Sequence, residues 1–302
     1  MTSAVQERSE QSSRRSSAFE SPAIHEGPHI EIWGVLNTTP DSFSDGGEFS
    51  TLERAIEQAQ RLRDEGAHVL DVGGASSRPR GITYGAGAEV VSVAEEIRRT
   101  APVLEATRAL GIKLSIDTTS ADVAAAAIHA GATRVNDVSM GASEALLRLV
   151  ASTGVELVLM HTRLDGRVIE ETTQYQDIVR DVIAELEFAA TRARGFGVAD
   201  AAIWFDPGLG FAKTASQSME LLARTSELVR HGRPLLVGAS RKSFLGVMSP
   251  APSGQPAPPR ERLGASLAAV CIAANAGARA VRVHDVSASR QAAWITERAR
   301  PR

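Results

Sequence analysis

Short apolar runs alternate along the chain with longer segments that carry apolar side chains every three or four residues. The runs have the length of buried strands and lie at 31–36, 67–70, 113–116, 132–135, 155–160, 201–205, 234–237 and 280–283. The longer segments predict helices over 52–65, 88–110, 121–130, 144–152, 175–194, 216–230, 260–276 and 287–299. Eight strand–helix repeats imply a parallel sheet and favour a closed (β/α)₈ TIM barrel, an α/β fold, over an open doubly wound sheet.

Polar residues with reactive side chains follow the predicted strands. At or just beyond the strand ends lie Asn37, Asp71, Asp117, Asn136, His161, Asp206, Arg241, Lys242, Arg282 and His284. The strands of such a barrel end at a common rim, where the active-site loops lie, so we expect these side chains to converge. The loops 37–50 and 73–87 are long and rich in glycine and serine, which is typical of lids.

A single barrel domain accounts for most of the 302 residues. We expect residues 1–27, which are rich in Ser, Glu and Arg, to be a disordered tail. Residues 28–302 then form the barrel, with a Pro-rich insertion without chemistry at 249–259. Hydrophobic residues make up 43%, enough for a large core, and the net charge of −3 gives no basic excess for nucleic acid binding.

Composition also bears on location and assembly. No apolar run reaches the ~18–20 residues of a membrane span, and the N-terminus lacks the apolar region of a secretory signal. The single cysteine, Cys271, is expected to be a buried structural thiol in a reducing compartment, so we expect a cytoplasmic protein. The predicted helix at 262–275 is apolar nearly all round, which indicates burial against a second subunit in a homodimer.

Eight motifs, in this order, resemble those of the dihydropteroate synthase family. They are NTTPDSFSDGG at 37–47, DVGGASSRP at 71–79, SIDT at 115–118, NDV at 136–138, MH at 160–161, FDPGLGFAKT at 205–214, GASRKSF at 238–244 and VRVHDV at 281–286. The resemblance implies a TIM barrel that condenses 6-hydroxymethyl-7,8-dihydropterin diphosphate with p-aminobenzoate. The products would be pyrophosphate and 7,8-dihydropteroate, for folate biosynthesis.

The residue types suit a pterin site. A carboxylate can accept two parallel N–H bonds from the guanidine-like pterin edge, and Asp206 is similar to the family's anchor for it. The resemblance places Asp117, Asn136 and Met160 beside it. Lys242 can donate to the ring carbonyl or a ring nitrogen, and the flat guanidinium of Arg282 can stack on the ring.

The departure of pyrophosphate requires positive charge and oriented donors. Arg282 and His284 are two residues apart and so share one face of the last strand. The resemblance adds Asn37 and Ser77 to the diphosphate contacts, with Mg²⁺ bound by Asn37 and, after loop closure, by Asp45. Lys242, Asp206, Arg282 and His284 are the expected catalytic residues.

The second substrate has a neutral aniline amine, whose lone pair needs no strong base. Catalysis should therefore rest on leaving-group departure and on positioning. The resemblance places the aniline ring between Phe43 and Pro79. Four further residues complete its pocket by resemblance, with Ser243 facing the carboxylate: Arg78, Phe211, Lys242 and Ser243.

Two departures from the family pattern leave an alternative open. Ala75 stands where the family has glutamate, although Ser77 keeps the hydroxyl of the usual threonine. Residues 162–167, TRLDGR, replace a Met-Arg-Gly-x-Pro-like stretch. These differences are compatible with a non-catalytic pterin-binding paralogue.

A pterin-dependent methyltransferase is disfavoured, because it needs no diphosphate residues such as Arg282 and His284. Asp71 and His161 are expected to support the site rather than to react.

Overall fold

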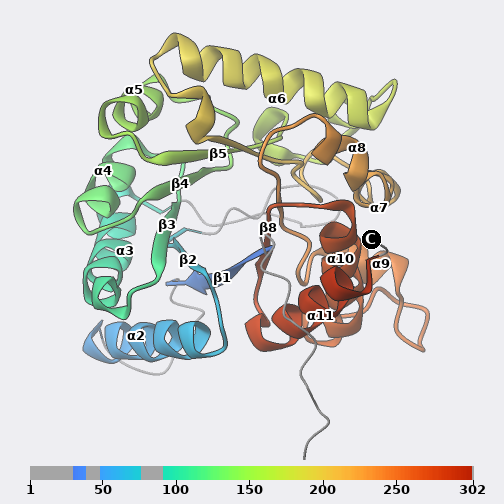
Figure 1. Cartoon of the computed structure of the whole chain (residues 1–302), viewed down its shortest axis with the longest axis horizontal. Helices are drawn as coiled ribbons and strands as arrows, with labels where there is room; N and C mark the ends of the chain where they lie inside the picture. Colours follow the sequence, from blue (N-terminus) through green and yellow to red (C-terminus); the bar gives the residue numbers. More distant parts are fainter. Residues whose placement is uncertain (1–29, 39–47, 76–90, 301–302) are drawn as a thin grey trace, which may run out of the picture.

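The computed structural model describes residues 30–38, 48–75 and 91–300, and within them eight parallel strands form one sheet (Figure 1). The strands are β1 (Glu31–Asn37), β2 (Val69–Gly73), β3 (Lys113–Asp117), β4 (Arg134–Asp137), β5 (Glu156–Met160), β6 (Ile203–Asp206), β7 (Leu236–Val237) and β8 (Ala280–Val283). Their order is β6-β5-β4-β3-β2-β1-β8-β7, and a parallel bridge between Phe205 and Leu235 joins the two end strands. The predicted TIM barrel is confirmed.

Helices surround the sheet on its outer side (Figure 1). They are α2 (Glu48–Asp64), α3 (Val93–Thr107), α4 (Ala121–His129), α5 (Glu144–Thr153), α6 (Ile178–Gly195), α7 (Ala215–Ala223), α8 (Thr225–Arg230), α9 (Ser243–Met248), α10 (Leu263–Ala276) and α11 (Val286–Ala299). Gly154 and Gly277 end α5 and α10 with φ of 69° and 91°, a left-handed turn that glycine adopts without a Cβ clash. Each turn leads directly into the next strand.

Three details differ from the sequence prediction. The single helix expected at 216–230 is two helices, α7 and α8, which meet at Arg224. Its guanidinium bonds to Asp177, Glu220 and Glu227. The short helix α9 follows Lys242 and was not predicted. Cys271 is half-buried rather than buried, with Sγ 3.9 Å from the carbonyl oxygen of Ala292 where α10 meets α11.

Some predictions fall outside the described residues. These are the disordered tail at 1–27 and most of the two lid loops, namely residues 39–47 of the loop 37–50 and residues 76–87 of the loop 73–87. Within the described part, no helix is long and apolar enough to cross a membrane.

The amino-terminal end of the barrel is filled by a buried arginine between two tryptophans. Arg134 is 2% exposed, and its guanidinium carbon lies 4.9 Å from the ring centroids of both Trp33 and Trp204. It bonds to Glu31 at 2.8 Å and also to Glu156. The two indole N–H groups donate to the same two carboxylates, each at 3.1 Å. Burial raises the pKa of Glu31, but the hydrogen bond and charge of Arg134 outweigh it and hold that pKa below its usual value.

Replacing Arg134 should therefore destabilise the barrel strongly. Arg134→Met leaves two carboxylates without their common partner, and a broken buried pair costs about 3–5 kcal/mol. Arg61→Met removes one i,i+4 pair from a side chain that is 63% exposed, and should cost less than about 1 kcal/mol. Urea unfolding of both variants measures the difference. Equal losses in the two proteins would contradict the structural role of Arg134.

Candidate active site

The opposite, carboxyl-terminal rim gathers polar side chains around Arg282 of β8. Its Nε donates to Asp71 Oδ2 at 2.5 Å, and its Nη2 donates to Asp117 Oδ2 at 2.9 Å. Asn136 Nδ2 donates to the same oxygen of Asp71 at 3.1 Å. Four strands thus meet in one hydrogen-bonded group. The edge of the guanidinium is fixed by carboxylates, so its flat face is the part that can stack on a ring.

Several buried acceptors in this group have no hydrogen-bond partner among the described residues. They are Asp71 Oδ1, Ser115 Oγ and Asn136 Oδ1. A buried polar atom without a partner costs free energy, and it recovers that cost when a ligand supplies the missing bond. The rim therefore offers several free acceptors to a ligand that carries N–H or O–H donors.

Asp206 and Lys242 form the second part of the site. The Asp206 side chain is buried, and its Oδ1 accepts from the backbone N–H of Gly208 at 2.7 Å. Lys242 Nζ donates to the carbonyl oxygen of Leu209 at 2.7 Å. A Cβ at Gly238 would lie 3.6 Å from Asp206 Oδ2 and 3.8 Å from Lys242 Nζ. Both groups thus face the space above Gly238.

Burial controls the electrostatics of the site. It raises the pKa of Asp117 to about 7, against the opposing charge of Arg282. It also raises the pKa of Asp206, with Lys242 opposing. Burial lowers the pKa of Lys242 to about 8, although Asp206 favours the ammonium form. Near neutral pH, Lys242 is therefore mostly a cation, but its pKa lies close to the pH of the solution.

His284 lies beside Arg282 at the end of β8. Its Nδ1 is 3.1 Å from Ser240 Oγ, and its backbone N–H donates to the same hydroxyl at 3.2 Å. Burial, and then the charge of Arg282, lower the pKa of His284 to about 4. The ring is therefore neutral near pH 7, and it can offer a hydrogen bond to a ligand but no positive charge.

Asn37 ends β1 with an exposed side chain. Its Oδ1 and Asp117 Oδ2 would each lie 3.8 Å from a Cβ at Gly73, so both flank that glycine. In the described part of the chain, no cluster of three or more His, Cys, Asp or Glu side chains could hold a metal ion. One amide oxygen on the rim suits Mg²⁺, which keeps several waters and binds substrate phosphates with few protein ligands.

The remaining predicted residues fall into two groups. Phe43, Asp45, Ser77, Arg78 and Pro79 lie outside the described residues. Met160 is buried and pairs in register with Asp206, and Ser243 is the first residue of α9. The ring centroid of Phe211 lies 4.9 Å from Lys242 Nζ. The structure thus brings a predicted p-aminobenzoate residue against a predicted pterin residue.

Asp71 was expected to support the site, and Ser115 was not among the predicted residues. Asp71 is fully buried and holds both Arg282 and Asn136. Ser115 precedes Asp117 by two residues on β3 and is paired in register with Asp71. This spacing puts Ser115 on the same face of the strand as Asp117, a signal that the sequence already contained.

Comparison with known proteins agrees with this geometry. The family model for pterin binding enzymes matches residues 33–284. The dihydropteroate synthase of Synechocystis sp. is 44% identical over 273 residues, which cover 90% of this chain and 90% of that protein.

Solved structures give the same result. The dihydropteroate synthase of Xanthomonas albilineans with 4-aminobenzoic acid has a TM-score of 0.80 at 37% identity, over 90% of this chain and 94% of that one. The same organism's enzyme in complex with 7,8-dihydropteroate has a TM-score of 0.77 at 36% identity, over 90% and 95% of the two chains. The chain belongs to the pterin-binding enzyme family, among the dihydropteroate synthases.

Proposed function

We propose that this protein condenses 6-hydroxymethyl-7,8-dihydropterin diphosphate with p-aminobenzoate, giving 7,8-dihydropteroate and pyrophosphate in folate biosynthesis. One observation carries the proposal: buried acceptors without partners lie beside Asp206, Lys242 and Arg282 on one rim. A pterin offers N–H donors along one edge, ring acceptors on another and a flat face. The rim offers the complement of each.

The first substrate is held by opposing groups. Gly208 fixes one oxygen of Asp206, which leaves the carboxylate in a set orientation for the pterin edge. Asn136 Oδ1 and Ser115 Oγ can accept further N–H bonds. Lys242 donates to the ring carbonyl or a ring nitrogen, in place of its bond to Leu209. Met160 supports the pterin from its buried position at the end of β5.

In the reaction, the aniline nitrogen forms a bond to the pterin methylene carbon, and the bond from that carbon to the diphosphate oxygen breaks. The electron pair of the broken bond leaves with pyrophosphate, and the amine loses one proton to the departing pyrophosphate or to water. Burial lowers the pKa of Arg282, but Asp71 and Asp117 more than offset this, so the guanidinium stays charged as the leaving group departs. His284 contributes a neutral hydrogen-bond donor.

The second substrate must approach over the pterin methylene. Phe211, whose ring lies against Lys242, forms one described wall of that approach. We assign Ser243 to the benzoate carboxylate, because it opens α9 next to Lys242. Phe43, Arg78 and Pro79 complete this pocket by family resemblance. The enzyme then acts mainly by holding the neutral amine in line with the methylene carbon and its diphosphate leaving group.

Bound Mg²⁺ would neutralise charge on the diphosphate and stabilise pyrophosphate as it leaves. We propose Asn37 and Asp45 as its protein ligands, with Ser77 on the diphosphate. The exposed amide of Asn37 at the rim supports the first of these assignments. Removing Mg²⁺ with EDTA in the product assay below should stop turnover. Adding excess Mg²⁺ should restore it.

One of the two differences that leave the non-catalytic alternative open includes a residue with structural contacts. Arg163, within the altered stretch 162–167, bonds to Glu185 and to the carbonyl oxygens of Thr172 and Gln174. Arg163 therefore braces α6, whereas Thr162 Oγ1 in the same stretch is buried without a hydrogen-bond partner among the described residues. Ala75 remains as a difference from the family that nothing in the structure explains.

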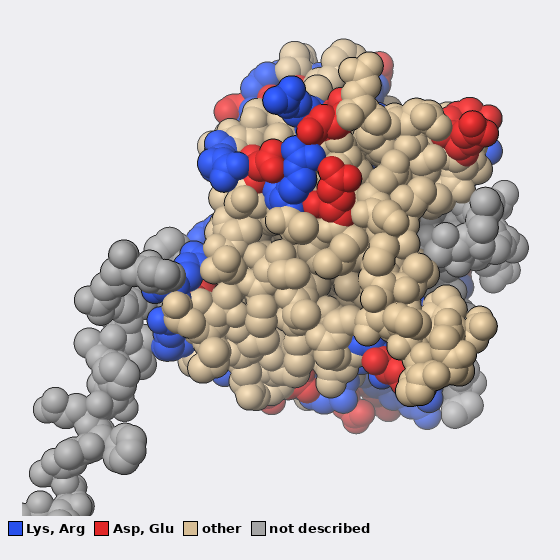
Figure 2. All heavy atoms as spheres, turned by 90° about the vertical axis from the view of Figure 1, so that its right-hand side faces the viewer, with Lys and Arg blue, Asp and Glu red and all other residues tan. Residues whose placement is uncertain are grey.

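We also propose a homodimer. Three apolar side chains on α9 and α10 are each more than 40% exposed: Val247, Met248 and Leu263. Figure 2 shows that much of this side of the molecule carries no charged groups. The single cysteine fits the reducing cytoplasm, where we place the protein.

Small-angle scattering should give the mass of two chains. Leu263→Glu would place a charge in the apolar patch and should shift the mass toward one chain. A single-chain mass for the unaltered protein would contradict the dimer.

The function is tested by supplying both substrates with Mg²⁺ and following dihydropteroate by chromatography. We expect product from the unaltered protein. Lys242→Ala and Asp206→Ala should each lower kcat/KM by roughly 100-fold or more, because the pterin loses an orienting contact. Arg61→Met is the matched control and should keep its activity. Pterin binding without product would support the paralogue instead.

The pKa of Lys242 predicts an alkaline limit to activity. The ammonium form donates to the pterin, and its proton is lost as pH rises through about 8. The rate constant kcat/KM should therefore fall above that pH. Lys242→Arg keeps the cation at all accessible pH values and should remove the fall, even if the overall rate is lower. An unchanged alkaline limb in Lys242→Arg would assign the limb to another group.

A further inference from the structure

A second buried lysine, Lys213, lies in the loop that joins β6 to α7. The chain has 33 Lys and Arg residues, of which three are lysines, and Lys213 is 2% exposed. Its Nζ contacts His161 Nδ1 at 2.9 Å, the carbonyl oxygen of Gly208 at 3.1 Å and that of Phe211 at 3.0 Å. Burial lowers the pKa of Lys213 well below its usual value, whereas Asp206 favours the ammonium form, whose three N–H bonds match these three acceptors.

The two backbone acceptors of Lys213 mark the ends of one tight turn. The N–H of Phe211 donates to the carbonyl oxygen of Gly208 at 3.0 Å, which closes the turn. Between them, the carbonyl oxygen of Leu209 accepts from Lys242. One turn therefore binds Lys213 at its ends and Lys242 near its middle. The turn also carries the Phe211 ring, which contacts Lys242.

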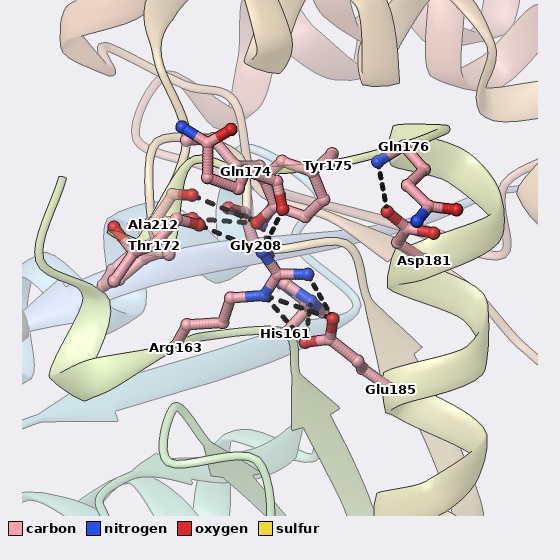
Figure 3. Close-up of polar contacts among 12 residues, drawn as sticks. His161, Arg163, Thr172, Gln174, Tyr175, Gln176, Asp181, Glu185, Gly208 and Ala212 are labelled. Carbon is pink, nitrogen blue, oxygen red and sulfur yellow. Dashed lines mark hydrogen bonds and ion pairs between the residues drawn. The ribbon is translucent and has the colours of Figure 1, made fainter. Parts of the chain in front are cut away.

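The His161 side chain that Lys213 contacts belongs to a network that joins the end of β5 to α6, and Figure 3 shows its members His161, Arg163 and Glu185. His161 Nε2 is 3.1 Å from Glu185 Oε2, and Glu185 also bonds to Arg163. The pKa of His161 is lowered to about 4 by burial and by the charge of Lys213, so the ring is neutral. With its Nε2–H facing the carboxylate, Nδ1 is the acceptor that Lys213 needs.

The same network returns to the loop next to Lys213. The guanidinium of Arg163 lies 4.0 Å from the ring centroid of Tyr175, whose hydroxyl donates to the carbonyl oxygen of Ala212 at 3.0 Å. The N–H of Ala212 donates to the carbonyl oxygen of Gly166. Ala212 has a φ of +51°, a strained value for a residue with a Cβ, which persists only where neighbours fix it.

We propose that Lys213 is a positioning residue of the active site: its bonds to His161, Gly208 and Phe211 hold the turn that sets Lys242 and the Phe211 ring in place. The kinetic effect expected from this role rests on the proposed function. Lys213 touches neither substrate in this arrangement. It acts through Leu209 and Phe211, which present a carbonyl to one substrate-binding residue and a ring to the second substrate.

The kinetic test compares Lys213→Met with Lys113→Met. Lys213→Met removes the three bonds, so kcat should fall and KM for p-aminobenzoate should rise, with a combined loss of about 100-fold in kcat/KM. A loss of folded protein alone would lower kcat and leave KM unchanged. Lys113 is 58% exposed and pairs with Glu31 at the far end of β3, so its variant should stay within about twofold of the unaltered protein.

Tyr175→Phe gives a test that changes no charge. It removes the hydroxyl bond to Ala212 and leaves the ring against Arg163. It should raise KM for p-aminobenzoate in the same direction, with roughly a fivefold loss in kcat/KM. If Lys213→Met does not fold, this variant alone decides the proposal.

A second readout does not depend on turnover. Protein labelled with ¹³C at the lysine Cε should give three signals, which the lysine variants assign. The Lys242 signal should move in both Lys213→Met and Tyr175→Phe, and should stay in place in Lys113→Met. Unaltered protein that makes no dihydropteroate would refute the proposed function, whereas these signals would still report on the turn.

Three outcomes overturn the positioning role. One is normal kinetics in a folded Lys213→Met protein. Another is a Lys242 signal that moves in neither variant. The third is a signal that moves in Lys213→Met alone, since the loss of a nearby charge would then account for it.

Discussion

The ion-paired guanidinium of Arg282 is the interaction on which the rest of the site depends. It joins β8 to Asp71 on β2 and to Asp117 on β3, although 165 residues or more separate it from each partner. An unpaired charge at this depth would cost several kcal/mol, so each of the three residues requires the other two. Only a barrel that closes β8 against β1 brings them together. The fold and the site are therefore specified by the same contact.

Charge balance extends this argument across the rim. Three buried carboxylates, Asp71, Asp117 and Asp206, are matched by Arg282, Lys242 and Lys213. Asp206 favours the charged form of both lysines, and both lysines in turn oppose the rise that burial causes in its pKa. A pterin ring brings no net charge, so it can enter without disturbing this balance. The diphosphate does bring charge, which is the physical reason that we propose a divalent cation at the rim.

Much of the fold could be predicted from sequence, because the strand–helix alternation is set by local periodicity and by glycines such as Gly154. The position of the rim residues was also predictable, since the carboxyl ends of all the parallel strands lie at the same end of the barrel. The sequence could not predict which of these groups form hydrogen bonds and ion pairs with one another. Asp71 was expected only to support the site and Lys213 was not singled out, because the contacts of both are made with other strands and loops. The break at Arg224 likewise depends on Asp177, 47 residues away.

The two ends of the barrel use the same kind of ion pair, for stability at one end and for the active site at the other. Arg134 at the amino-terminal end and Arg282 at the carboxyl-terminal end each bridge two carboxylates. Around Arg134 the set is closed, because two indole rings cover the guanidinium and their N–H groups bond to the same carboxylates. Around Arg282 the set is open, because Ser115 and Asn136 keep acceptors that no described residue fills. If all polar groups of the carboxyl-terminal rim had partners, as those around Arg134 do, the protein would be more stable. No acceptor would then be left to bind a ligand.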